Sequence, residues 1–360
     1  QGAFGLSSGL IYAPGRFAAT DEIVALSRVA ARDGGIYASH MRSEGDRLLE
    51  AIDEAIAIGA RSGAPVLIHH LKASGRRNWG RMDAAVARIE AARAGGADVM
   101  ASVYPYVASS TGLDQVLPGW ATEGGYEATL ARLADPALRS RLEAEMSGVS
   151  PTGDWALGTS AGGPSGVQIS DVIVDSLTRY EGMRLDAVAA ERGQSAAASA
   201  LDILLADSLR TSAIYFSMSE DDLVTALKQP WVMIGGDAGA RALDGPLSSD
   251  QPHPRAFATF PRILCRYVRE QRVLTLEDAV RKMTSLPAAR AGLADRGVVA
   301  PGRFADLTIF DPATVCDRAT FEQPKQLAVG IHHVVVNGVP VLRDGEPTGA
   351  LPGRGLRRGR

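Results

Sequence analysis

The chain has 360 residues, of which 46% are hydrophobic, and its formal net charge is −3. This length and composition allow a large buried core, and the near balance of charge argues against nucleic acid or an anionic membrane surface as a partner. No apolar stretch approaches the length that crosses a bilayer, so we expect no membrane partner.

Apolar strands alternate with amphipathic helices along the first hundred residues. Strands are predicted at 3–6, 35–40, 64–70 and 98–106, with helices from Thr20 to the glycine pair at 34–35, at 47–59 and at 82–94. A further strand is predicted at 231–237. This alternation is typical of an α/β protein with a parallel sheet and right-handed crossovers.

Polar side chains collect where these strands end, among them His40, His70, Tyr104 and Asp237. In a (β/α)8 barrel the carboxyl ends of the strands build the active site, and an open doubly wound sheet gathers ligands there too. No glycine-rich phosphate loop follows these strands, which weakens a nucleotide-binding interpretation. Five strands leave a full barrel about three strands short.

Two regions depart from this rhythm. Residues 111–210 include a glycine- and serine-rich run at 158–168, and we interpret the region as an insertion that acts as a lid or substrate wall. From 293 the chain has short β runs between Gly and Pro turns. We therefore divide the chain into a barrel portion at 1–292 and a small β domain with a tail at 293–360.

The adjacent residues His69 and His70 cannot both face the same side of a strand, because strand side chains alternate. Val66, Ile68, His70 and Lys72 share one face, which turns polar at its end. We therefore predict that His70 and Lys72 enter the site together, and that His69 packs against the helix layer as a structural residue.

His40 and His70 end neighbouring strands and are candidates for one metal site. Zinc takes imidazole nitrogens, and catalytic zinc sites keep a position open for water. Asp237, at the end of another strand, is placed to take a proton from that water. The alternative is that these are three unrelated polar residues at loop entrances.

The two cysteines, Cys265 and Cys316, both lie in apolar stretches. We predict two buried thiols rather than a disulfide, and a reducing cytoplasm as the location.

The sequence resembles the N-acyl-D-amino-acid deacylases (D-aminoacylases), a family of metal-dependent amidohydrolases. The resemblance rests on ordered motifs that cover nearly the whole chain. They are YASHMRSEG, HLKASGRRNWGR, YPYVASST, MIGGDAG, HPRAFATFPRIL, KMTSLPAARAGLADRGVVAPGRFADLTIFDP and VNGVPV. It implies a (β/α)8 barrel beside a small β-sandwich, zinc as cofactor, and hydrolysis of N-acyl-D-amino acids to a carboxylate and a D-amino acid.

The resemblance also implies roles for individual residues. His40 and His70 match zinc ligands, and Asp237 matches the catalytic aspartate. The positions that hold the substrate are Lys72, Tyr104, Ser110 and Arg255. His253 stays open between a structural residue and one that supports the site, whereas His332 and His333 are expected to be structural.

The chain departs from the family pattern in two respects. The family usually has Ser-Asp-Gly around the aspartate, where this sequence has Gly236, Asp237, Ala238 and Gly239. The family's His-x-His pair and metal-binding cysteine are not found, and the chain opens at Gln1 within a strand-like pattern. We therefore expect a fragment or processed product with an incomplete site.

Two rival functions remain. A hydantoinase-like enzyme would cleave cyclic amides, but such enzymes often use a carboxylated lysine, and no lysine here ends an early strand. A non-catalytic, truncated remnant is the other rival.

Overall fold

A five-stranded parallel sheet forms the centre of the computed structural model, which describes residues 2–148, 157 and 162–358. The strand order is β1 (Gly5–Gly9), β2 (Ile36–His40), β3 (Val66–Ile68), β4 (Val99–Val103) and β8 (Val232–Ile234). The sheet stays open, and it contains the five strands predicted from the sequence. Because all strands run the same way, their carboxyl ends meet at one edge.

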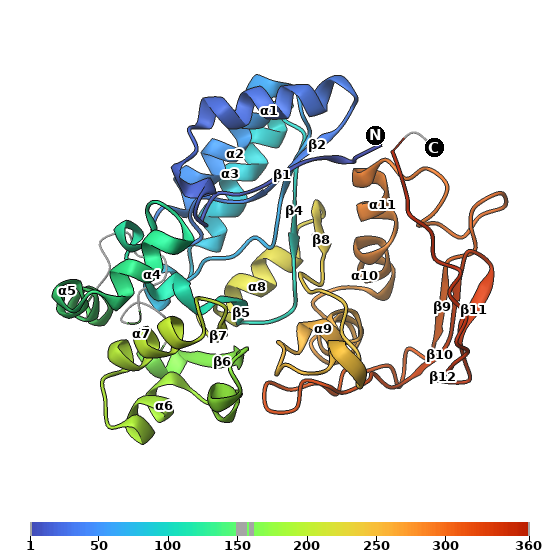
Figure 1. The fold of residues 1–360 in the computed structure, drawn as a ribbon. Helices are drawn as coiled ribbons and strands as arrows, with labels where there is room; N and C mark the ends of the chain where they lie inside the picture. The colour runs from blue at the N-terminus through green and yellow to red at the C-terminus, as the bar shows by residue number, and fades with distance from the viewer. Residues whose placement is uncertain (1, 149–156, 158–161, 359–360) are drawn as a thin grey trace.

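Helix α1 (Thr20–Arg32) follows β1, α2 (Leu48–Ser62) follows β2, and α3 (Met82–Ala94) follows β3, whereas α8 (Glu220–Leu227) directly precedes β8. In Figure 1, α1, α2 and α3 lie side by side along one face of the sheet. Their apolar sides share a core with the strands, with Ile52, Ile58 and Ile89 fully buried. A Cβ at Gly59 of α2 would come within 2.3 Å of a Val66 methyl group, so glycine lets this helix approach β3 closely.

The region around the predicted insertion at 111–210 has a hydrophobic core of its own, which also includes Ile11 and Tyr215 from outside those bounds. Its antiparallel sheet has the order β5 (Ser109–Gly112), β7 (Ser212–Tyr215) and β6 (Val167–Asp171). Helices α4 (Tyr126–Ala134), α5 (Pro136–Ser147), α6 (Leu185–Arg192) and α7 (Ala196–Ala206) pack around it. Residues 158–161 of the glycine- and serine-rich run lie outside the described residues, and the lid role stays a prediction.

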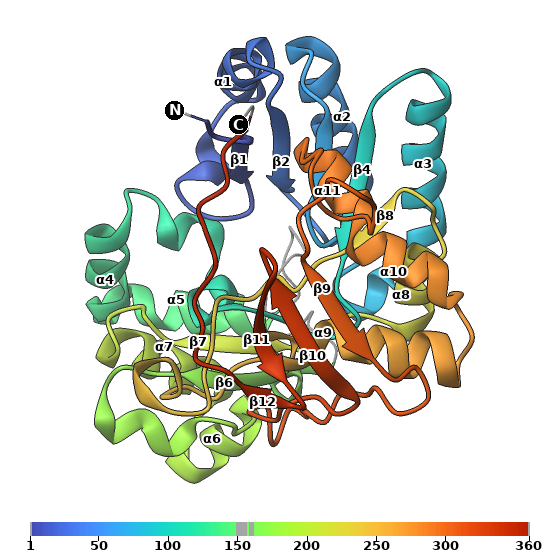
Figure 2. The ribbon, with the colours of Figure 1, turned by 90° about the vertical axis from the view of Figure 1, so that its right-hand side faces the viewer.

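The last third of the chain begins with helices and ends in a second sheet. The helices are α9 (Arg255–Arg262), the π-helix η8 (Ile263–Glu270), α10 (Leu276–Met283) and α11 (Ser285–Ala291). Strands β12 (Glu346–Pro347), β11 (Val339–Arg343), β10 (Ile331–Val336) and β9 (Leu307–Phe310) then form an antiparallel sheet in that order, seen in Figure 2. Within the described residues this sheet is a single layer, where the family resemblance implies a sandwich.

Short 3-10 helices complete the described elements. They are η1 (Gly15–Phe17), η2 (Arg76–Asn78), η3 (Leu113–Val116), η4 (Gly119–Thr122), η5 (Gly163–Gly166), η6 (Asp175–Tyr180) and η7 (Gly245–Leu247). None of the helices in the described part of the chain is long and apolar enough to cross a membrane.

The prediction of two free thiols is wrong, because Cys265 and Cys316 form a disulfide with a Cα–Cα distance of 4.8 Å. Cys265 lies in η8 and Cys316 follows β9, so the bond joins the helical part to the second sheet. The apolar setting of each cysteine was recognised, but apolar burial does not reveal that two residues 51 positions apart meet.

Candidate active site

A cavity of about 390 Å³ lies at the carboxyl ends of the parallel strands. All the predicted site residues line it: His40, His70, Lys72, Tyr104, Ser110, Asp237 and Arg255. They come from the ends of β2, β3 and β4, from β5, from the loop after β8 and from the start of α9. Parallel strands direct their ends to one edge, and this brings residues as far apart as His40 and Arg255 together.

The buried carboxylate of Glu44 is at the centre of this cluster, and the sequence analysis did not identify it. Its Oε1 atom lies 2.5 Å from Lys72 Nζ, 3.0 Å from His70 Nδ1 and 3.7 Å from His40 Nε2. Only 1% of the Glu44 side chain is exposed. The one sequence signal was its position four residues after His40, in the loop that follows β2.

The two histidine rings lie edge to face with centroids 4.4 Å apart. Burial lowers the pKa of His40 to about 3, despite the opposing charge of Glu44. Its imidazole is therefore neutral at pH 7 and has a lone pair to offer a metal. For Glu44, burial opposes ionisation, but Lys72, His40 and His70 together outweigh it and hold the pKa well below its usual range.

The residues present fit a divalent metal. One ligand atom each from His40, Glu44 and His70 lies within 4.8 Å of the others. In the described residues, His40 Nε2 and Glu44 Oε2 are buried and have no hydrogen-bond partner. Buried polar atoms are normally paired, and imidazole nitrogen and carboxylate oxygen are zinc ligands.

The prediction that His69 faces the helix layer is wrong, because His69 lines the same cavity as His70. Strand β3 ends at Ile68, and His70 has a φ of 37°, in the left-handed region. The rule of alternating sides holds only while the backbone is extended. The turn is held by Ser102, whose hydroxyl accepts from the His70 amide (3.0 Å) and whose carbonyl accepts from the Leu71 amide (2.8 Å).

Asp237 and Arg255, which line the same cavity, form an ion pair with Oδ2 and Nη1 2.8 Å apart. Asp237 follows β8 with a φ of 45°, a second left-handed residue just after a strand. Arg255 also donates from Nη2 to the carbonyl of Ser110 at 3.3 Å. Its guanidinium lies over the Tyr104 ring, 4.6 Å from the centroid.

Two tyrosines add hydroxyl groups. The Tyr104 hydroxyl is buried and has no hydrogen-bond partner in the described residues, and burial raises its pKa well above the usual range. It therefore stays protonated and is free to donate. Tyr12, which the sequence analysis missed, lies against His40 at a ring distance of 4.8 Å and accepts from the Thr111 hydroxyl at 3.1 Å.

The remaining histidines lie outside the metal cluster. His253 is buried behind Arg255, as described below. His332 and His333 are on β10 and are not among the residues that line the cavity.

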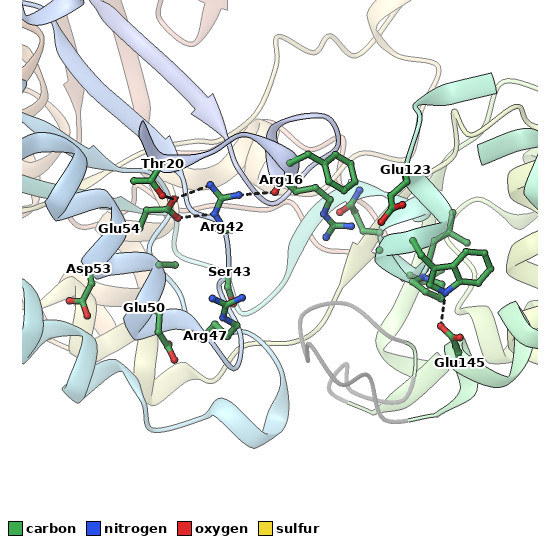
Figure 3. A pocket seen from close by; sticks show the side chains of 18 of the residues that line it. Arg16, Thr20, Arg42, Ser43, Arg47, Glu50, Asp53, Glu54, Glu123 and Glu145 are labelled. Atoms are coloured by element: carbon green, nitrogen blue, oxygen red, sulfur yellow. Dashed lines mark hydrogen bonds and ion pairs between the residues drawn. The ribbon is translucent and has the colours of Figure 1, made fainter. Parts of the chain in front are cut away.

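A larger cavity of about 790 Å³ lies between α2 and the η3–η4 region and shares no lining residue with the first. In Figure 3, Arg42 bridges Glu54 and the carbonyl of Arg16, and Thr20 donates to Glu54. No histidine or cysteine is among the described residues that line it. Its charged groups do not reproduce the donor set of the smaller cavity.

Comparisons with known proteins place the chain in a family. Residues 17–342 match the model of the amidohydrolase family. D-aminoacylase of Alcaligenes xylosoxydans xylosoxydans is 39% identical over 99% of this chain and 62% of the relative. N-acyl-D-glutamate deacylase of the same organism is 37% identical over 99% and 61%.

A solved structure gives the same result. The N-acyl-D-glutamate deacylase from Bordetella bronchiseptica, complexed with zinc and a phosphonate inhibitor that mimics the tetrahedral intermediate, matches with a TM-score of 0.76 and 34% identity. The match covers 96% of this chain and 62% of that chain. The chain thus spans about three fifths of the length of these relatives. By sequence and by fold, this chain belongs to the amidohydrolase family.

Proposed function

We propose that this chain forms part of a zinc-dependent hydrolase that converts N-acyl-D-amino acids to a carboxylate and a D-amino acid. The observation that carries the proposal is one cavity lined both by the cluster of His40, Glu44 and His70 and by the Asp237–Arg255 pair. The first group suits a metal, and the second combines a general base with a carboxylate binder. The relatives named for D-aminoacylase and N-acyl-D-glutamate deacylase activity support this substrate class.

His40 and His70 would hold a zinc ion, which would supply Lewis acidity toward the amide carbonyl and toward a water molecule. Asp237 takes a proton from the attacking water and passes it to the leaving nitrogen. Tyr104 donates a hydrogen bond from its hydroxyl group to the carbonyl oxygen as negative charge develops there.

Arg255, Lys72 and Ser110 hold the substrate carboxylate. The planar guanidinium of Arg255 can bind it through two parallel hydrogen bonds. Lys72 Nζ donates to Glu44 Oε1 at 2.5 Å. It also lies 2.8 Å from His70 Nδ1, but a neutral His70 ring that binds zinc through one nitrogen carries its proton on the other and cannot accept from Lys72. The remaining Lys72 donors are therefore available to the substrate. With the carboxylate and the amide both fixed, the configuration at Cα decides where the side chain lies.

The test is a substrate panel on the complete gene product that carries this chain. We expect zinc in the purified protein and turnover of N-acetyl-D-methionine, with little turnover of the L isomer. Turnover of hydantoin or dihydrouracil instead would support the cyclic-amide rival. Zinc-loaded, folded protein without turnover of either class would support the non-catalytic rival.

A cytoplasmic location stays a prediction, and the Cys265–Cys316 disulfide removes the thiol argument for it.

A further inference from the structure

His253 is buried directly behind Arg255, and it makes two hydrogen bonds of fixed direction. Its Nε2 lies 3.0 Å from the carbonyl oxygen of Ala108, and its Nδ1 lies 3.0 Å from the backbone amide of Arg255. A carbonyl only accepts and an amide only donates, so the proton is on Nε2 and the lone pair is on Nδ1. Burial holds the pKa of His253 well below its usual value, which agrees with this neutral ring.

These two bonds join the two chain segments that hold the guanidinium. Ala108 directly precedes β5, and the carbonyl of Ser110 in β5 accepts from Arg255 Nη2. His253 thus connects the Arg255 backbone to the segment that contains Ala108 and β5. The Ser110 carbonyl connects the Arg255 side chain to the same segment. The Arg255 amide is also the first of helix α9, where no intrahelical acceptor exists.

Aromatic rings hold the imidazole from the other sides. Tyr106 lies perpendicular to it with centroids 5.0 Å apart, and Phe321 lies at 5.0 Å and 80°. Tyr104, the ring beneath the guanidinium, lies at 6.3 Å. The ring therefore has little room to rotate, and both of its nitrogens keep their partners.

We propose that His253 is a positioning residue, which sets the Arg255 guanidinium for the substrate carboxylate by accepting the Arg255 amide at Nδ1 and donating to Ala108 at Nε2. This inference rests on the proposed function, because it assigns Arg255 to the carboxylate. His253 touches neither the metal cluster nor the reacting atoms, and it acts only through Arg255.

A pair of matched variants separates the two bonds. In His253→Asn the amide oxygen takes the place of Nδ1, so the Arg255 amide keeps an acceptor. In His253→Gln the longer side chain places its amide nitrogen near Nε2, so the bond to Ala108 is retained and the acceptor for Arg255 is lost. Both variants remove the ring, so the loss of aromatic packing is common to them.

Two measurements on the complete gene product test the proposal. In hydrogen–deuterium exchange followed by NMR, the Arg255 amide should stay protected in the Asn variant and exchange at least about tenfold faster in the Gln variant. The preference for an N-acetyl-D-amino acid over its methyl ester, expressed as a ratio of kcat/KM values, should fall about tenfold more in Gln than in Asn.

Equal exchange rates and equal acid-to-ester ratios in the two variants would overturn the proposal and leave His253 as a packing residue. If the wild type turns over no N-acyl-D-amino acid, the proposed function fails. The exchange rates then still decide whether Nδ1 holds the Arg255 backbone. If turnover is found and only the exchange rates differ, His253 orders the backbone without setting the guanidinium, and the positioning role is overturned.

Discussion

The carboxylate of Asp237 lies 2.8 Å from the guanidinium of Arg255, although we assign these residues to different tasks. The Asp237 side chain is 41% exposed and the Arg255 side chain 7%. Arg255 is also fixed by the Ser110 carbonyl and the Tyr104 ring, so Asp237 is the partner that is free to move. Under the proposed function, a substrate carboxylate that binds Arg255 would compete with Asp237 for the guanidinium and would release Asp237 to act as the base.

Replacing Asp237 with Asn should remove most turnover, because the amide has nearly the same shape but cannot accept the proton of the attacking water. We expect kcat to fall by about 10²-fold or more while zinc content stays nearly unchanged. Steady-state kinetics and metal analysis provide the measurement. Asp244→Asn, in the same loop but outside the cavity, serves as the matched control, and an Asp237→Asn enzyme as active as this control would end the proposed role.

Replacing Arg255 with Ala should act mainly through the substrate carboxylate. Losing one partner of a buried charge pair should weaken transition-state binding by about 2–5 kcal/mol, measured as the fall in kcat/KM for an N-acetyl-D-amino acid. The kcat/KM for the methyl ester should fall less, because the ester has no full charge that could pair with Arg255. In addition, the variant lacks the ion pair that restrains Asp237. Arg241→Ala is the control, since Arg241 pairs with Asp250 instead. Equal losses for acid and ester would argue against carboxylate recognition.

Replacing Glu44 with Gln should destabilise the protein, because it leaves the buried ammonium group of Lys72 without its ion-pair partner. We expect the free energy of unfolding to fall by about 3–5 kcal/mol. Zinc affinity should fall about 10–100-fold, since Glu44 also contacts His70.

The double variant Glu44→Gln, Lys72→Met removes the unpaired charge, so it should recover part of the lost stability. Denaturant unfolding and zinc titration measure both effects. A double variant no more stable than Glu44→Gln alone would show that the ion pair is not the cause.

The effect of acid on stability should include a contribution from His253. Its folded-state pKa lies well below the ordinary value near 6.5, so the unfolded chain binds the proton first and wild-type stability falls as the pH drops below about 6.5. His253→Phe cannot take up this proton. The difference in free energy of unfolding between wild type and variant should therefore become smaller from pH 8 to pH 5. Denaturant unfolding at both pH values measures this difference, and an unchanged difference would contradict the prediction.

Removing the disulfide by Cys265→Ser and Cys316→Ser should lower the free energy of unfolding by about 2–4 kcal/mol, because the bond closes a loop of 51 residues. Thermal unfolding without reductant compares the two proteins. Dithiothreitol should bring the wild type close to the double variant and leave the variant unchanged. Identical melting temperatures without reductant would mean that the bond contributes nothing.

The sequence by itself determined the parallel sheet and the end of it that carries the chemistry. Short apolar runs predict the strands, and apolar residues that recur about every 3.6 positions predict the helices between them. These patterns are visible in the sequence because each strand or helix must bury its own apolar side chains. Parallel strands place their carboxyl ends together whatever the loops do. For that reason His40, His70 and Asp237 were predictable as neighbours from their positions alone, whereas the proposed substrate-binding set came from the family motifs.

Only the tertiary structure decided what lies between these residues. Glu44, Tyr12 and the Cys265–Cys316 bond became visible when the fold brought distant segments within contact distance. His69 joined the cavity because the backbone turns left-handed at His70. Such turns and loop contacts depend on which groups from other elements satisfy the backbone, as Ser102 does here, and no local pattern of residues encodes that partner.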